Sequence, residues 1–344
     1  MTCHAAYRAS VMRRAGLLAA GLAGLLALIV LDLGSGSSSL TAAEVVSALL
    51  AGPDTEGVGG VIVWSIRLPM TLTALFVGTA LAAAGLGIQT ITGNALASPS
   101  TLGITSAASF GAAVAITCGF TIAGALWLGT SAAAFAAALL VSGAIHKLGS
   151  LRGMSPTSII LAGIVMNFFF MALQQVLQYR SSPEIAQVIA GWTFGNLERS
   201  TWLSAAAGGI ATVVCGLYLG VKSWALTALT VGEERAMSLG VDVRGLRVTV
   251  FVLCAVLVAA AVGFIGTVSF VGLVAPHCAR LVLGEDQRFL LPGTVIAGGM
   301  LMLASSVIAK ALSAGAMLPV GIITSLVGVP FLLALLLRDR GSWR

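Results

Sequence analysis

The chain has 344 residues, of which 58% are hydrophobic and only 9% are charged, with a mean hydropathy of +1.05. A soluble domain usually carries about a quarter charged residues, so this composition indicates an integral membrane protein. The net charge of +6 would suggest nucleic acid in a soluble protein, but here the basic residues sort to one side of a membrane. The five cysteines show no paired spacing, which supports neither a disulfide framework nor a metal site.

The first expected element is a membrane span near the N-terminus. Residues 1–30 have a basic start and an apolar run, as a signal peptide does, but the run is long and no A-x-A-like cleavage site precedes Asp32. The remaining spans follow from the gaps between charged residues, because a helix crosses the hydrocarbon in about 20 residues. The gap from Arg67 to Lys147 suits three spans, and the gap from Arg247 to Arg280 suits two short helices. The other gaps suit one each, so we expect an all-α integral membrane fold of about ten transmembrane helices.

The distribution of basic residues tests this count. With the N-terminus inside, fourteen of the 18 Lys and Arg residues are cytoplasmic, and only Arg67, Arg180, Arg199 and Lys310 face outward. This split obeys the positive-inside rule. If residues 248–279 formed a single span, the basic C-terminus would lie outside. We therefore expect a multi-pass protein with both termini in the cytoplasm.

The fifth expected span, residues 157–179, carries a stripe of polar amides. Asn167, Gln174 and Gln178 fall at spacings of seven and four, which places them on one helical face with Met171. Amides in a membrane helix normally point toward protein or toward a water-filled cavity. The stripe therefore either lines a substrate pathway or only forms hydrogen bonds with neighbouring helices.

The stretch 221–247 is the one strongly charged interruption of the apolar chain. Gly232 and Gly240 bracket a short helix over 233–239, whose first turn has the carboxylates that suit the positive end of the helix dipole. Such a short helix is marginal alone in water. Its apolar residues Ala236, Met237 and Leu239 therefore need a surface to lie on. The stretch is either a binding site for a soluble partner or a solvated loop.

The chain contains no phosphate-binding loop of the G-x-x-x-x-G-K-[ST] type, no carboxylate pair and no nucleophile with a base, so it is not expected to be an enzyme. His277 is interpreted as a structural hydrogen-bonding residue, with a ligand or proton-relay role as the alternative. A secondary transporter usually needs charged residues within its spans, and the expected spans have none. A purely structural scaffold would not need the amide stripe.

Four blocks of sequence carry a resemblance to a known family: RLPMTLTALFVGTALAAAGLGIQTITGNALASPSTLGI (67–104), SLGVDV (238–243), GFIGTVSFVGLVAPHCARLVLG (263–284) and LPVGIITSLVGVPFLLALLLR (318–338). Together they resemble the FecCD permeases, the membrane subunits of ABC importers for iron–siderophore complexes, haem and vitamin B12. The resemblance implies a single permease domain over 1–344 with the fold of the vitamin B12 importer permease. It also implies a cytoplasmic membrane location, no cofactor bound by this chain, and no nucleic-acid partner.

The resemblance further implies partners and roles. Two permease copies, identical or related, would form the pathway, cytosolic ATPases would use ATP to power it, and an extracytoplasmic binding protein would deliver the ligand. The fifth and tenth spans would border the pathway. The residues implied for ATPase coupling, within a cytoplasmic loop at about 221–247, are Glu233, Glu234, Arg235, Ala236, Leu239 and Gly240.

Two outer cations are implied in docking the binding protein. Arg67 and Lys310 would pair with its acidic residues, whereas Met70 stands where the family usually has a second arginine and cannot form an ion pair. The ligand favoured by family frequency is an iron(III)–siderophore complex. Haem, cobalamin and other metal chelates or oxyanions are the alternatives.

Overall fold

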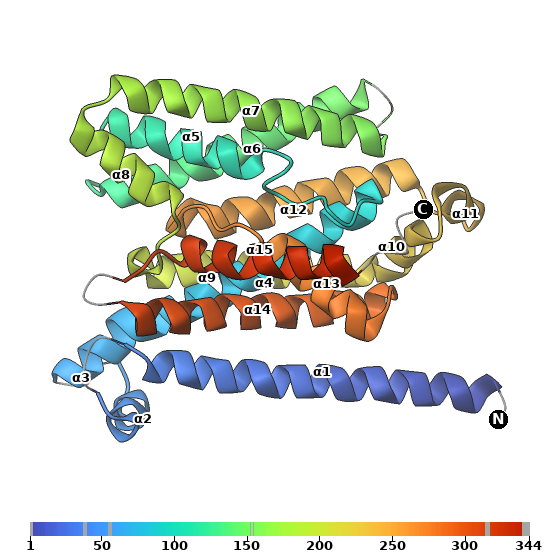
Figure 1. Cartoon of the computed structure of the whole chain (residues 1–344), viewed down its shortest axis with the longest axis horizontal. Coiled ribbons are helices and arrows are strands. Elements are labelled where there is room, and N and C mark those ends of the chain that lie inside the picture. The colour runs from blue at the N-terminus through green and yellow to red at the C-terminus, as the bar shows by residue number, and fades with distance from the viewer. Residues whose placement is uncertain are drawn as a thin grey trace.

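The computed structural model describes residues 3–36, 40–53, 57–151, 153, 155–313 and 317–338. Within these ranges every named element is a helix, and the longer helices lie side by side along the long axis of the molecule (Figure 1). Seven stretches are long and apolar enough to cross a membrane. They are α1 (Cys3–Gly34), the continuous run α3 (Val58–Val61), η1 (Ile62–Arg67) and α4 (Leu68–Thr92), α6 (Leu126–Ser150), α7 (Pro156–Arg180), α9 (Trp202–Val221), α12 (Val243–Ile265) and α14 (Gln287–Leu312).

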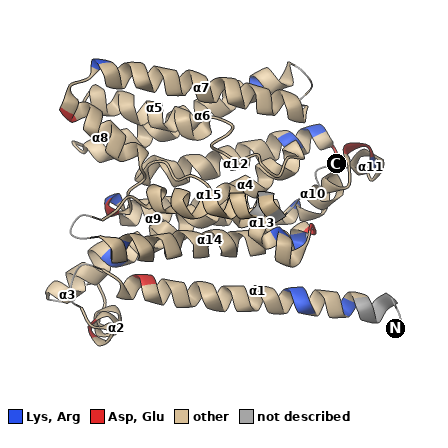
Figure 2. Cartoon of the chain, in the orientation of Figure 1, with Lys and Arg blue, Asp and Glu red and all other residues tan. Residues whose placement is uncertain are grey.

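Three of the four shorter apolar helices in the described ranges complete the bundle: α5 (Ile104–Thr117), α13 (Val271–Leu283) and α15 (Val320–Arg338). Together with the seven longer spans they make ten, which confirms the all-α fold and the number expected from the charge gaps. The connecting helices are α2 (Ala42–Ala51), α8 (Pro183–Thr193), η2 (Leu197–Arg199), α10 (Ser223–Thr230) and α11 (Glu233–Ser238). Figure 2 shows that the charged residues gather toward the two ends of the bundle.

The expectation of two short helices between Arg247 and Arg280 is wrong for the first of them. Helix α12 has 23 residues and begins at Val243, before Arg247, and α13 has 13 residues and continues past Arg280. Gap counting assumes that a charged residue ends a span. Arg247 is only 5% exposed and has its own partners inside the protein, so the helix continues through it.

Helix α4 lies at the centre of the bundle. In its most apolar window 83% of the residues are buried, against 17% for α1 and for α7, which lie at the edges. Small residues let its neighbours approach closely. A Cβ atom at Gly85 would lie 1.7 Å from the carbonyl oxygen of Gly272 in α13, and one at Gly78 would lie 2.4 Å from that of Gly298 in α14. Helices α4, α13 and α14 therefore pack backbone against backbone.

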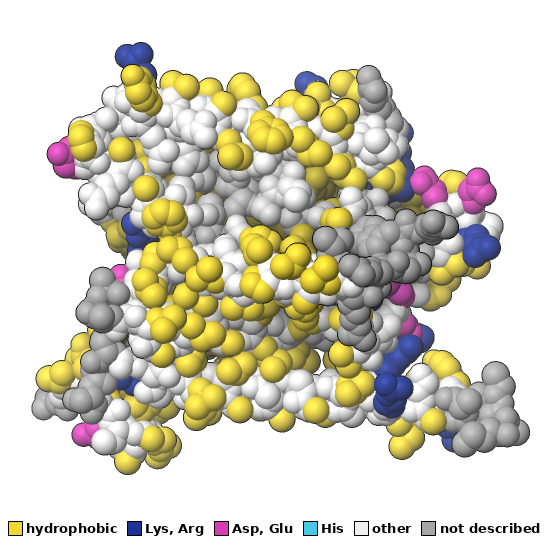
Figure 3. All heavy atoms as spheres, viewed as in Figure 1, with side chains coloured by type: hydrophobic (Ala, Val, Ile, Leu, Met, Phe, Trp, Pro, Cys, Tyr) yellow, Lys and Arg dark blue, Asp and Glu magenta, His cyan; other side chains and the backbone are white. Residues whose placement is uncertain are grey.

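Apolar side chains cover much of the face seen in Figure 3. Exposed large residues occur along the outer side of α7, where Phe168, Phe169 and Val176 are each more than half exposed. Such a surface would be unstable in water and is stabilised by lipid. Figure 1 also shows that α1 begins and α15 ends at the end of the bundle where α11 lies.

Candidate functional site

The three expected amides of α7, joined by a fourth at Gln175, line one cavity of about 530 Å³, so the structure brings the expected stripe together. Ser155 caps the start of α7 by accepting a hydrogen bond from the backbone N–H of Ser158, and Pro156 occupies the first turn, where its missing N–H is not needed. From this fixed start the helical repeat brings Asn167, Gln174 and Gln178 to the inner side of α7.

The opposite wall of the cavity is made mainly of hydroxyl groups. They come from the turn before α5, from α5 itself, from the end of α8 and from the turn before α13. These residues are Ser100, Thr101, Thr105, Ser106, Ser109, Thr193, Thr267 and Ser269. Ser106 donates a hydrogen bond to the side-chain oxygen of Asn167, so one amide of the stripe also joins α5 to α7.

No lining residue of this cavity is charged. The arrangement offers many weak hydrogen-bonding groups and no strong electrostatic site, which suits passage better than tight binding. Sequence reasoning missed the hydroxyl wall, because serine and threonine occur throughout these helices without the periodicity that marks α7. The ring of His277 packs edge-on against Phe331, 6.0 Å away between centroids. His277 is not among the residues that line this cavity.

The short helix in the charged stretch is confirmed as α11. Its ends are set by glycines with positive φ, +122° at Gly232 and +82° at Gly240, a region that other residues rarely adopt. Met237 and Leu239 are more than half exposed. Glu234 and Arg235 are also exposed, so α11 presents a mixed charged and apolar surface.

Two residues of the expected coupling set, Ala236 and Glu233, contact the rest of this chain. Ala236 is fully buried against its own chain, so the expectation that it offers a free apolar edge is wrong. Glu233 accepts hydrogen bonds from both terminal nitrogens of Arg247, at 3.1 and 2.7 Å. This bidentate pair fixes the start of α11 to α12.

The two cations expected to dock the binding protein are not exposed, and the expectation that they stand free for docking is wrong for both side chains. Arg67 is 4% exposed and donates to the backbone oxygens of Leu33 and Gly34. The ammonium group of Lys310 lies 2.8 Å from a carboxylate oxygen of Asp32, which is fully buried. The charge count treated Asp32 as the end of a span, whereas it lies in the last turn of α1 and has a partner there. Met70 is also buried beside this cluster.

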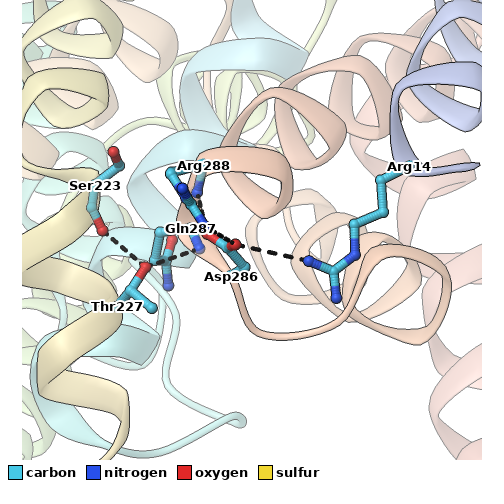
Figure 4. A network of polar contacts seen from close by, with 6 residues as sticks. All are labelled: Arg14, Ser223, Thr227, Asp286, Gln287 and Arg288. Atoms are coloured by element: carbon cyan, nitrogen blue, oxygen red, sulfur yellow. Dashed lines mark hydrogen bonds and ion pairs between the residues drawn. The ribbon is translucent and has the colours of Figure 1, made fainter. Parts of the chain in front are cut away.

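A second cluster of charges lies at the opposite end of α14 (Figure 4). Asp286 caps α14 and pairs with Arg288 at 2.8 Å and with Arg14 of α1 at 3.6 Å. Hydrogen bonding from Arg288 is the main reason that the pKa of Asp286 is lowered. The carboxylate therefore remains charged well into the acidic range.

An all-helical, multi-pass bundle that holds a neutral polar cavity and carries a charged loop at one end is the architecture of a membrane transport permease. The sequence model of the FecCD transport family matches residues 24–338. The chain belongs to this family.

Relatives within the family bear names for different ligands. The chain is 37% identical over 281 residues to the cobalamin import system permease protein BtuC of Halobacterium salinarum, covering 81% of this chain and 74% of the relative. It is 35% identical over 321 residues to the hemin transport system permease protein HmuU of Yersinia pestis, covering 92% and 95%. Among solved structures, a metal-chelate type ABC transporter in an inward-facing conformation superposes with a TM-score of 0.81 at 32% identity, covering 94% of this chain and 99% of that one.

Proposed function

We propose that this FecCD permease imports iron(III)–siderophore complexes, and that the cavity beside α7 is part of its pathway. The observation that carries the proposal is the lining of that cavity, which is polar, uncharged and shared by the amide stripe and the hydroxyl wall. Weak, scattered hydrogen-bonding groups let a bulky polar ligand pass without a deep energy minimum. Recognition then belongs to the external binding protein, and release is not slowed.

The chemistry of the ligand follows from the same lining. A free oxyanion would gain from cationic groups, and a flat apolar haem would gain from aromatic or aliphatic walls; the cavity has neither, apart from Met171. A ferric complex with hydroxamate-type ligands has little net charge and a surface of amide and hydroxamate oxygens. It therefore complements serine, threonine, asparagine and glutamine side chains.

The assembly proposed is that of a binding-protein-dependent ABC importer in the cytoplasmic membrane, with both termini in the cytoplasm. A second permease copy would complete the pathway, and separate ATPase subunits would hydrolyse ATP. The charged loop with α10 and α11 is the proposed contact with these subunits, through Glu234, Arg235, Leu239 and Gly240. An extracytoplasmic protein would deliver the ligand at the opposite end.

The pathway is tested by thiol accessibility. In a background without the native cysteines, Asn167→Cys, Gln174→Cys and Gln178→Cys are expected to react with a membrane-impermeant maleimide, at rates that change with nucleotide when the ATPase subunits are bound. Phe169→Cys and Val176→Cys are the matched controls on the same helix, outside the cavity, and should remain protected by lipid. Equal protection at all five positions would contradict the pathway.

The ligand is tested by uptake into proteoliposomes that contain the importer, with the binding protein present. Labelled ferric hydroxamate, haem, cobalamin and molybdate are compared at equal concentration. Uptake of the ferric complex alone supports the proposal. Preference for any of the other three ligands would overturn the ligand assignment and leave the pathway assignment to the thiol experiment.

A further inference from the structure

The last turn of α4 receives hydrogen bonds from three other helices on three consecutive residues. The guanidinium of Arg280 in α13 donates to the side-chain oxygen of Gln89 at 3.2 Å. The side-chain amide of Gln287 in α14 donates to the hydroxyl of Thr90 at 3.0 Å. The Nε of Arg247 in α12 donates to the carbonyl oxygen of Ile91 at 3.3 Å.

The bonds from Gln287 and Arg247 are buried, and the bond from Arg280 is partly buried. Gln89, Thr90 and Ile91 are 3%, 7% and 1% exposed, and Gln287 is 1% exposed. Inside a protein a hydrogen bond is stronger than in water, and a partner that loses it is costly to leave unpaired. Separating these donors from α4 would therefore cost free energy. A displacement of α12, α13 or α14 is thus passed to the last turn of α4.

Two of these donors also hold the charged loop. Arg247 makes its bidentate ion pair with Glu233 at the start of α11. The backbone N–H of Gln287 donates to the hydroxyl of Thr227 in α10 at 3.1 Å (Figure 4). A single bridging residue thus connects each helix of the proposed ATPase contact to the last turn of α4: Gln287 connects α10, and Arg247 connects α11.

On its other side, α4 leads directly to the cavity. The helix ends at Gly93, which has φ +58°, and the following segment, residues 93–103, contributes Ser100 and Thr101 to the cavity wall. The segment ends at Gly103, where φ is +73° and a Cβ atom would lie 2.5 Å from the backbone nitrogen of Asn167. Segment 93–103 is therefore packed backbone to backbone against the amide stripe of α7.

We propose that the last turn of α4, Gln89–Ile91, is the junction through which movement of α10 and α11 reaches the cavity. The route runs from Glu233 and Thr227, through Arg247 and Gln287, into α4, and along segment 93–103 to Asn167. This inference rests on the proposed function, because it assigns the route by which the ATPase contact acts on the pathway. Gln287 and Arg247 are positioning residues in this route.

The test compares two buried threonines of one helix. The hydroxyl of Thr90 donates to the carbonyl of Leu86 at 2.8 Å and accepts from Gln287, whereas that of Thr92 donates to the carbonyl of Ile88 at 2.7 Å. Thr90→Val therefore removes an intrahelical bond and the bond to α14. Thr92→Val removes an intrahelical bond at the same end of the helix and is the matched control.

The measurement is the labelling rate of Gln174→Cys by a membrane-impermeant maleimide, with and without ATP and Mg²⁺, in the permease purified with its ATPase subunits. Thr90→Val should reduce the nucleotide-dependent change in rate by about 2- to 30-fold, the range of long-range coupling effects. ATP hydrolysis should continue, and Thr92→Val should behave as the parent. Thr90→Ser keeps the hydroxyl and should restore the response.

Gln287→Leu should reproduce Thr90→Val, and the double variant should be no worse than either, because both remove the same bond. A full response in Thr90→Val and Gln287→Leu would overturn the junction while leaving the proposed function intact. An equal loss in Thr92→Val would also overturn it, since that loss would come from the helix and not from the link. No nucleotide response in the parent complex would overturn the proposed function and the junction together.

Discussion

The buried ion pair between Asp32 and Lys310 gives the sharpest stability prediction. The lysine ammonium group lies 2.8 Å from the carboxylate of Asp32 and also donates to its backbone oxygen at 2.9 Å. The hydroxyl of Thr71 donates to the other carboxylate oxygen at 2.6 Å. The perturbations are Lys310→Met, Asp32→Leu and the two together.

The expected magnitude follows from burial. Asp32 is fully buried and the side chain of Lys310 is 7% exposed, so solvent cannot compensate a charge that loses its partner. Breaking a buried pair on one side costs about 3–5 kcal/mol, whereas replacing both partners by apolar groups is often neutral. A cost of this size corresponds to a fall of roughly 5–10 °C in the unfolding midpoint of a large domain.

The assay uses the protein's own thiols. Cys215 and Cys254 are buried, and a thiol-reactive dye will report their exposure as the detergent-purified protein is heated. Each single variant should unfold at a lower temperature than the parent, and the double variant should recover most of the difference. A midpoint unchanged in Lys310→Met, or a double variant that shows the sum of both losses, would refute the reasoning.

Three further predictions concern the loop, the ion-pair cluster and the central helix. Leu239→Asp, at an exposed position of the loop, should leave folding unchanged and reduce transport per ATP hydrolysed by the importer. The folded-state pKa of Asp286 is lowered, so its stabilising effect is present above the unfolded pKa and is lost as pH falls through the folded one. The parent should progressively lose its stability advantage over Asp286→Asn in thermal unfolding as the pH falls below about 4. Gly85→Ala places a Cβ 1.7 Å from a backbone oxygen of Gly272, and a loss of about 1–3 kcal/mol in thermal stability is expected from such overpacking.

Much of the architecture could be predicted from the sequence, because lipid leaves few choices for the backbone. A chain with long charge-free gaps must form helices, and the lengths of those gaps set how many spans each can hold. The amide stripe of α7 was also predictable, since spacings of seven and four are a direct consequence of helical geometry. The glycines around α11 predicted a short helix for a similarly local reason.

The errors arise where a charged residue has a partner that is distant in the sequence. Asp32 and Lys310 are 278 residues apart, and no local pattern shows that they meet. Arg247 was expected to end a span, but inside the protein its guanidinium pairs with Glu233 and donates a hydrogen bond to the carbonyl oxygen of Ile91. Burial of Ala236 likewise depends on how α11 lies against its own chain, and a six-residue helix gives no periodic signal.

Helix α1 shows why such charges are placed at the ends of the bundle. In lipid, apolar side chains gain little by exchanging lipid contacts for helix contacts, so apolar packing alone fixes the axial position of a peripheral helix weakly. The N-terminal half of α1 is tied by Arg14 to Asp286, directly before α14, and its last turn is tied by Asp32 to Lys310, near the end of α14. Because the two ion pairs join α1 and α14 at two separate levels, both can form in only one axial position of α1 along α14. A slip of one turn, about 5.4 Å, would break both pairs and leave the carboxylate of Asp32 unpaired in an apolar setting. The charges that the sequence places at the two membrane faces therefore hold α1 in register on α14.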